Sequence, residues 1–177
     1  DKDQSKIERL HDGIMPIYEP GLAELVGSNV AAGRLTFTTS LAEGIKGADA
    51  IFIAVGTPSR RGDGHADLSF VYAVAAEIGA NLANDAVVVT KSTVPVGTGD
   101  EVERILKDSG TSHKFSVVSN PEFLREGAAI GDFKRPDRIV IGAEDDFGRK
   151  VMSAVYRPLF LNESPILFTG RRTSELI

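Results

Sequence analysis

Two glutamates, Glu122 and Glu126, stand four residues apart in the stretch SNPEFLREG at residues 119–127. This stretch follows the apolar run FSVV at residues 115–118, so we expect a loop at the end of a strand. On a helical turn the two carboxylates would share one face, and like charges at that spacing raise the pKa of one of them. Such a carboxyl group suits proton transfer near neutral pH. The pair is equally compatible with a solvated turn that opens a helix, because acidic residues favour helix N-termini.

Composition places the chain among ordinary globular proteins. It has 177 residues, of which 42% are hydrophobic and 25% are charged, which fits one soluble domain with a core. No apolar run approaches the ~20 residues that cross a bilayer, and no segment resembles a signal peptide. We therefore expect a cytoplasmic location and no membrane partner. With 20 basic and 25 acidic residues, the net charge of -5 argues against a nucleic-acid partner.

The chain contains no cysteine, which excludes disulfides, thiolate metal ligands and cysteine nucleophiles within it. Its three histidines, His11, His65 and His113, are scattered and lack the spacing of metal ligands. We predict no metal site.

Short apolar runs alternate with amphipathic stretches along the chain. The predicted strands are residues 35–38, 50–55, 86–90, 115–118, 138–141 and 166–168. The predicted helices are residues 7–13, 40–47, 68–82, 99–106, 124–130 and 146–160. Runs such as IFIAV and AVVV are apolar throughout, which is typical of parallel strands covered on both faces. The alternation predicts a doubly wound α/β domain.

Two helix starts carry capping signals. Ser40 and Glu43 have the spacing of a capping box, and Asp67 precedes the apolar-periodic run at residues 68–82. Both signals predict a helix that begins directly after a short polar turn.

Three loops at predicted strand ends carry polar or acidic residues. They are VGTP at residues 55–58, KSTVPVGT at residues 91–98 and SNPEF at residues 119–123. The carboxyl ends of parallel strands meet at one edge of a sheet, where ligands bind in this architecture. Thr57 and Thr93 offer hydroxyl groups there, while prolines restrict the loops. We predict a functional site on this rim, although each loop alone could be ordinary turn chemistry.

No GxGxxG phosphate loop occurs in the chain. The nearest matches, GDG at residues 62–64 and GTG at residues 97–99, lack the third glycine. Asp1, however, stands directly before a predicted helix. It therefore fits the acidic residue that ends the second strand of a dinucleotide fold and binds the ribose hydroxyls. A frayed terminus is the alternative interpretation of Asp1.

Together VGTP, KSTVPVGT, NPEFLREG and RPDRIVIG, the last at residues 135–142, closely resemble the UDP-glucose 6-dehydrogenase family. Related nucleotide-sugar dehydrogenases share parts of this pattern. The resemblance spans the chain from Asp1 to the final TGRRTSELI. It implies a Rossmann-like parallel sheet without its first strand, its glycine loop and most of its second strand. Residues 1–177 would form a partial N-terminal NAD-binding domain, without the central helix, the UDP-binding domain and the catalytic cysteine.

The resemblance also implies an activity. The complete enzyme would oxidise UDP-glucose to UDP-glucuronate with NAD in two successive hydride transfers, usually as a homo-oligomer, and the 177-residue chain would be inactive and unstable alone. Two alternatives stay open. The first is a dehydrogenase of another nucleotide sugar such as GDP-mannose, and the second is a nucleotide-binding module without catalysis.

The resemblance assigns roles residue by residue. The implied NAD contacts are Asp1, Lys6, Val55, Thr57, Thr93 and Glu126. The implied catalytic residues are Thr93, Glu122 and Glu126. The implied contacts with the UDP-sugar are Glu122, Phe123, Leu124, Arg125 and Glu126. A threonine hydroxyl can orient water and a partly desolvated carboxylate can accept its proton, so these residue types suit such roles.

Overall fold

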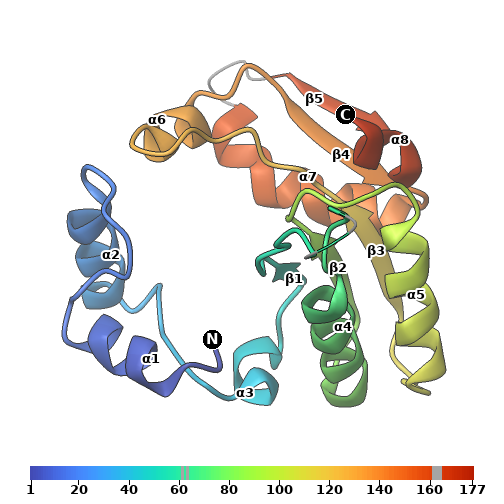
Figure 1. The fold of residues 1–177 in the computed structure, drawn as a ribbon, viewed down its shortest axis with the longest axis horizontal. Coiled ribbons are helices and arrows are strands. Elements are labelled where there is room, and N and C mark those ends of the chain that lie inside the picture. Colours follow the sequence, from blue (N-terminus) through green and yellow to red (C-terminus); the bar gives the residue numbers. More distant parts are fainter. Residues whose placement is uncertain (61, 63, 161–164) are drawn as a thin grey trace. The chain divides into compact units, whose positions relative to one another are not determined.

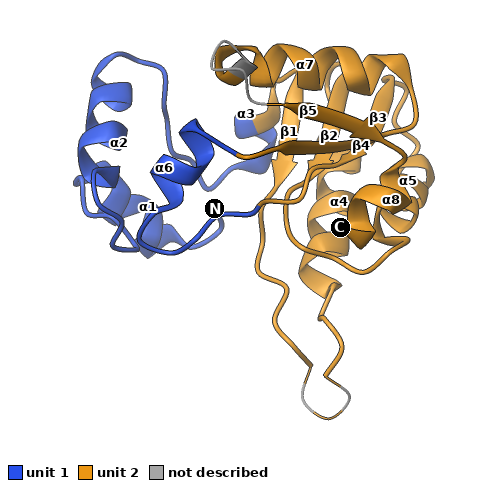
Figure 2. Cartoon of the chain, turned by 90° about the horizontal axis from the view of Figure 1, so that it is seen from above, with its two compact units in different colours: residues 1–44, 123–136 blue, residues 45–122, 137–177 orange. Residues whose placement is uncertain are grey.

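A computed structural model describes residues 1–60, 62, 64–160 and 165–177 of the chain. Arg61 and Asp63 therefore lie outside the described part, and Asp63 is the middle residue of the GDG stretch. The chain forms two compact units (Figure 2). Unit 1 contains residues 1–44 and 123–136, and unit 2 contains residues 45–122 and 137–177.

Unit 2 is built on a five-stranded sheet with the strand order β1-β2-β3-β4-β5 (Figure 1). The strands are β1 (Ala50–Ile53), β2 (Ala86–Thr90), β3 (Phe115–Ser119), β4 (Ile139–Ala143) and β5 (Ile166–Thr169). They correspond to five of the six predicted strands. The prediction of an α/β fold is confirmed, and the apolar run AVVVT forms a strand that is buried along its whole length.

The sheet departs from all-parallel pairing at one place. β1, β2 and β3 run parallel, and β4 and β5 run parallel to each other, but β4 is antiparallel to β3 with Ser119 opposite Gly142. Between β3 and β4 no helix carries the chain back along the sheet, because part of this segment belongs to unit 1. The chain re-enters the sheet from the end at which β3 leaves it, so β4 must run in the opposite direction.

Helices cover both faces of the sheet (Figure 2). One face carries α4 (Ser69–Asn81), α5 (Thr98–Asp108) and α8 (Arg171–Leu176), while α7 (Asp146–Phe160) packs on the other. α4 buries Val71, Ala75 and Ile78, the face that its apolar periodicity predicts. Asp67 accepts a hydrogen bond from the Ser69 amide at 3.0 Å, but the N-cap of α4 is Leu68, so Asp67 stands one residue before the capping position that was predicted for it. No described helix is both long and apolar enough to cross a bilayer.

Unit 1 contains three helices and most of a fourth. They are α1 (Gln4–His11), α2 (Leu22–Ala31), α6 (Ala129–Lys134) and the first four residues of α3 (Leu41–Ile45). The predicted capping box is half formed, because Ser40 Oγ accepts from the Glu43 amide at 3.3 Å while the Glu43 carboxylate instead accepts from Thr38 Oγ1 at 3.1 Å. Sequence periodicity did not predict α2.

Two predicted elements are wrong. Residues 35–38 form no strand, because no strand of the described sheet pairs with them. The Thr38 carbonyl instead accepts from the Asp1 amino group at 3.1 Å. Residues 124–130 are helical only from Ala129 onward. Gly127 has a φ of 79°, a left-handed conformation that a helix cannot continue through.

Candidate functional site

The loops that follow β1 and β2 are joined by side-chain hydrogen bonds at the rim of the sheet. Ser92 Oγ donates to the Val55 carbonyl at 2.7 Å, and Thr57 Oγ1 donates to the Thr93 carbonyl at 3.3 Å. The structure thus brings three of the predicted site residues, Val55, Thr57 and Thr93, to one place in unit 2. Ser92, which fastens the two loops together, escaped sequence reasoning although it lies within the KSTVP motif.

The loop at residues 91–98 presents Thr93 to solvent and is anchored on both sides of it. Val94 is buried beneath the loop, whereas Thr93 itself is exposed. Thr98 Oγ1 donates to the Pro95 carbonyl at 2.6 Å, which closes the turn before α5. Gly97 enters α5 with a φ of 93°, a conformation that side chains rarely adopt. Thr93 therefore stands on an exposed but tightly folded loop.

A polar network of Lys91, Asn120 and Tyr156 lies directly under this rim. Lys91 Nζ donates to Asn120 Oδ1 and to Tyr156 Oη, both at 3.3 Å, and Tyr156 Oη also donates to Asn120 Oδ1. Asn120 Nδ2 donates to the Val140 carbonyl at 2.8 Å. Asn120 and Tyr156 are almost fully buried, so these bonds replace water. No motif predicted this network. The one sign of it in the sequence is Lys91, a lysine that directly follows an apolar strand.

Burial shifts the protonation of two members of this network. It lowers the pKa of Lys91, while the nearby Glu122 carboxylate acts in the opposite direction and raises it. Burial also raises the pKa of Tyr156 to about 12, against a smaller lowering by the hydrogen bond to Asn120. Lys91 thus places a positive group close enough to Glu122 for their charges to interact.

The acidic loop, residues 120–127, does not form the helical turn that the spacing of Glu122 and Glu126 predicted. Residues 121–125 have no regular structure, so Glu122 and Glu126 do not share a helix face. Glu122 belongs to unit 2, whereas the four residues that follow it, Phe123, Leu124, Arg125 and Glu126, belong to unit 1. All five side chains are exposed. An exposed loop with two carboxylates and two apolar side chains can contact a ligand that is both polar and hydrophobic.

Arg125 has an acidic partner within unit 1. Its amide and Nε each donate to Asp132 Oδ2 at 3.0 Å, and Nη2 donates to Oδ1 at 2.7 Å. These bonds lower the pKa of Asp132 to about 2. Nearby, the Gly127 amide donates to Glu19 Oε2 at 2.8 Å, a contact that sequence reasoning missed. Asp132 of α6 and Glu19 therefore hold this part of the acidic loop within unit 1.

The predicted ribose contacts, Asp1 and Lys6, also lie together in unit 1. Asp1 Oδ2 accepts from Lys6 Nζ at 2.7 Å and Oδ1 accepts from the Asp3 amide at 3.1 Å. The Asp1 side chain is 42% exposed, and a carboxylate has about four acceptor positions. It can therefore still accept hydrogen bonds from ribose hydroxyls, and Asp1 fits this part of a dinucleotide. Among the described residues, no group of three acidic or histidine side chains could hold a metal ion.

The family comparison covers most of the chain. Residues 1–160 match the family described as "UDP-glucose/GDP-mannose dehydrogenase family, NAD binding domain". The UDP-glucose 6-dehydrogenase of Rhizobium meliloti (strain 1021) is 66% identical over 179 residues, covering 100% of this chain and 41% of that protein. TuaD, a UDP-glucose 6-dehydrogenase of Bacillus subtilis (strain 168), is 46% identical and is covered over 38% of its length. The chain thus spans about two fifths of the curated relatives that it matches.

Solved structures agree with the fold. A UDP-glucose dehydrogenase from the archaeon Pyrobaculum islandicum aligns with a TM-score of 0.92 at 45% identity, over 98% of this chain and 40% of that one. A ternary complex of GDP-mannose dehydrogenase from Pseudomonas aeruginosa aligns with a TM-score of 0.93 at 34% identity, over 99% of this chain and 41% of that one. The two similarities place the sheet and its rim loops in a known structural class.

Proposed function

This chain belongs to the UDP-glucose/GDP-mannose dehydrogenase family, and we propose that its protein oxidises UDP-glucose to UDP-glucuronate with NAD as the hydride acceptor. The proposal is carried by the 66% identity to a UDP-glucose 6-dehydrogenase along the whole chain. That identity spans all the rim loops and the acidic loop. The rim offers hydroxyl and carboxylate groups, which an alcohol oxidation needs for orienting the substrate and moving its protons.

Asp1 and Lys6 are proposed to bind the ribose hydroxyls of NAD. NAD, when bound, would accept a hydride from the carbinol carbon, and the oxidation of alcohol to acid takes two such transfers and one water molecule. Val55 and Thr57 are also proposed as NAD contacts, and the bonds to Ser92 and Thr93 fix their position. These contacts contribute affinity and orientation, since holding reactants in place removes much of the entropic barrier.

Thr93, Glu122 and Glu126 are proposed as the residues that touch the reacting groups. The exposed Thr93 hydroxyl can orient a water molecule, and the two carboxylates can accept and return protons. Glu122 and Glu126 are also proposed to contact the sugar. Phe123 and Leu124 are proposed to do so as well and supply apolar surface. Because Arg125 binds Asp132, we propose that it sets the shape of this loop for the UDP-sugar.

The test compares two nucleotide sugars with the full-length product of the gene that encodes this chain. We expect NADH formation with UDP-glucose at a kcat/KM about 10-fold or more above that with GDP-mannose, since a site built to hydrogen-bond one ligand discriminates strongly. Thr93→Val should lower kcat with UDP-glucose. A preference for GDP-mannose would point to the related dehydrogenases, and saturable NAD binding without turnover would point to a binding module.

Assembly and location complete the proposal. From the family to which the chain belongs, we propose a homo-oligomer that acts in the cytoplasm. Sedimentation of the full-length product and fractionation of the cells that make it are the measurements that test these two points.

A further inference from the structure

Helix α8 contacts the loop that carries Thr93 through a single carboxylate. Glu175 Oε2 accepts from the Gly97 amide at 2.6 Å, and Oε1 accepts from the Gly99 amide at 2.7 Å. Both amides belong to the start of α5, which follows the Thr93 loop directly. Glu175 is more than 70 residues away in sequence, so this is a tertiary contact and not a local cap.

Gly97 makes this contact necessary, and Gly99 makes it possible. The first amides of a helix lack internal partners, and the N-cap residue Gly97 has no side chain to supply one. Glu175 satisfies two of these amides with a charge that suits a helix N-terminus. A Cβ at Gly99 would lie 2.9 Å from Glu175 Oε1 and 2.5 Å from Arg171 Cδ, so only glycine permits this approach.

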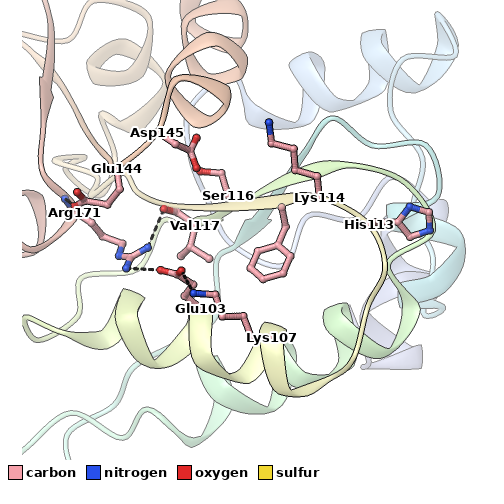
Figure 3. A pocket seen from close by; sticks show the side chains of 10 residues that line it. Glu103, Lys107, His113, Lys114, Ser116, Val117, Glu144, Asp145 and Arg171 are labelled. Carbon is pink, nitrogen blue, oxygen red and sulfur yellow. Dashed lines mark hydrogen bonds and ion pairs between the residues drawn. The ribbon is translucent and has the colours of Figure 1, made fainter.

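Arg171 fixes α8 against α5 on the same side (Figure 3). Its side chain is only 7% exposed and its Nη2 lies 2.6 Å from Asp100 Oδ1 and 2.7 Å from Glu103 Oε2. Figure 3 shows the guanidinium turned toward Glu103 and toward Val117, whose carbonyl accepts from Nη1 at 3.4 Å. A buried guanidinium with two carboxylate partners holds its helix in one place, since losing either partner is costly.

The same face of α8 also reaches the strand that leads to Glu122. Ser174 is fully buried, and its Oγ donates to the carbonyl of Ser119, the last residue of β3, at 3.1 Å. Gly142 on β4 leaves the space for this contact, because a Cβ there would lie 2.5 Å from Ser174 Cβ. Helix α8 therefore holds the chain at two places. One is the start of α5, which follows the loop that carries Thr93, and the other is the end of β3, which precedes Glu122.

We propose that Glu175 is a positioning residue for the site: by binding the amides of Gly97 and Gly99 it fixes the end of the loop at residues 91–97 and so the place of Thr93. Glu175 binds backbone amides of the loop and of α5, so it acts on Thr93 through the loop that carries it. The inference rests on the proposed dehydrogenase function, in which Thr93 orients water.

The test is Glu175→Gln in the full-length gene product, alone and combined with Thr93→Val. A glutamine side chain offers one acceptor atom, so one of the two amides loses its partner. We expect kcat with UDP-glucose to fall about 10-fold or more, since small misplacements near the chemistry have large effects. In the Thr93→Val background the same change should have much less effect, because both act through one group. Asp108→Asn, a matched charge removal at the exposed far end of α5, should keep the wild-type kcat.

Two results would overturn the proposal. One is a wild-type kcat in Glu175→Gln, and the other is an equal fold-loss in the wild-type and Thr93→Val backgrounds. If the wild-type protein itself does not oxidise UDP-glucose, the proposed function fails. Amide hydrogen exchange then tests whether Glu175 binds the start of α5. Whichever of the Gly97 and Gly99 amides loses its partner should exchange about 10-fold faster in Glu175→Gln, and unchanged rates at both amides would reject the contact. Glu175→Asp, with a shorter carboxylate, replaces Glu175→Gln if that variant does not fold.

Discussion

Lys91, Asn120 and Tyr156 show how single buried residues support an exposed site. Asn120 uses both ends of its amide, because Oδ1 accepts from Lys91 and Tyr156 while Nδ2 donates to the Val140 carbonyl. A polar network of this kind stabilises a structure only when every member is satisfied. Lys91 and Asn120 each belong to a rim loop, so the network ties the loops after β2 and β3 to helix α7.

Asn120→Ala should destabilise the protein because it leaves several buried groups without their partner. Each such group costs about 1–3 kcal/mol, and Asn120 serves three of them. We expect the Tm of the full-length gene product to fall by at least about 4 °C in calorimetry. Asn81→Ala is the control, since Asn81 is exposed and bonds only within α4. A Tm loss no larger than that of the control would contradict the role of the network.

Arg125→Gln should raise the pKa of Asp132 from about 2 toward the ordinary value of 3.8. Because the folded pKa is lowered, the pair stabilises the fold fully above about pH 4, and this contribution is lost as pH falls toward 2. Carboxyl chemical shifts in an NMR titration measure the change. Lys134→Gln removes a positive charge near Asp132 in sequence and should leave its pKa low. An unchanged titration in Arg125→Gln would show that another group holds Asp132 ionised.

Among the elements, α8 packs closely on β4 at Gly142. A Cβ at Gly142 would lie 2.5 Å from Ser174 Cβ and 2.8 Å from Arg171 Cα, which is backbone and cannot move aside. Gly142→Ala should therefore displace α8, lower the Tm and accelerate amide exchange in α8, with a stability loss of about 1–3 kcal/mol. Gly131→Ala in α6 meets nothing within 4 Å and should be neutral or stabilising. Equal behaviour of the two variants would mean that α8 is not seated closely on β4.

Sequence patterns predicted strand β2, in which every residue is buried. The run AVVVT became β2 because only a covered parallel strand is apolar at every position, and the strand ends then had to meet at one rim. Residues 35–38 have a similar local preference, yet strand structure needs a neighbour and they have none in the described sheet. The helix expected at residues 124–130 failed at Gly127, whose left-handed backbone no local pattern reveals.

The site was predicted in part for the same reason. The sequence predicted that Thr57 and Thr93 lie at the same edge of the sheet. Each stands in a loop that follows a strand, and the topology brings these strand ends together. The contact between Lys91 and Tyr156 could not be predicted, since they are 65 residues apart and Tyr156 lies on a helix whose burial depends on the whole fold. The contact of Glu175 with Gly97 is equally invisible, because no spacing rule links a carboxylate to a distant helix start.

At the scale of the whole molecule, the described sheet ends in strands that bear exposed apolar side chains. β1 buries Ile51 and Ile53 on one face, but Phe52 on the other face is 39% exposed because α7 packs on β2, β3 and β4. β1 has a single strand neighbour, β2, within the described residues. Unpaired backbone beside an exposed aromatic ring favours pairing with another chain.

Phe52→Lys should therefore reduce association of the 177-residue chain more than the same change elsewhere on its surface. A lysine on an edge strand opposes strand pairing, because the ammonium resists desolvation against a second sheet. Light scattering across a concentration series measures the association. Phe70→Lys is the matched control, because Phe70 is 53% exposed but lies on helix α4, which has no strand edge to offer. A stronger effect of Phe70→Lys would show that the chain associates through general apolar surface, whereas a selective effect of Phe52→Lys identifies the open edge of β1 as the cause.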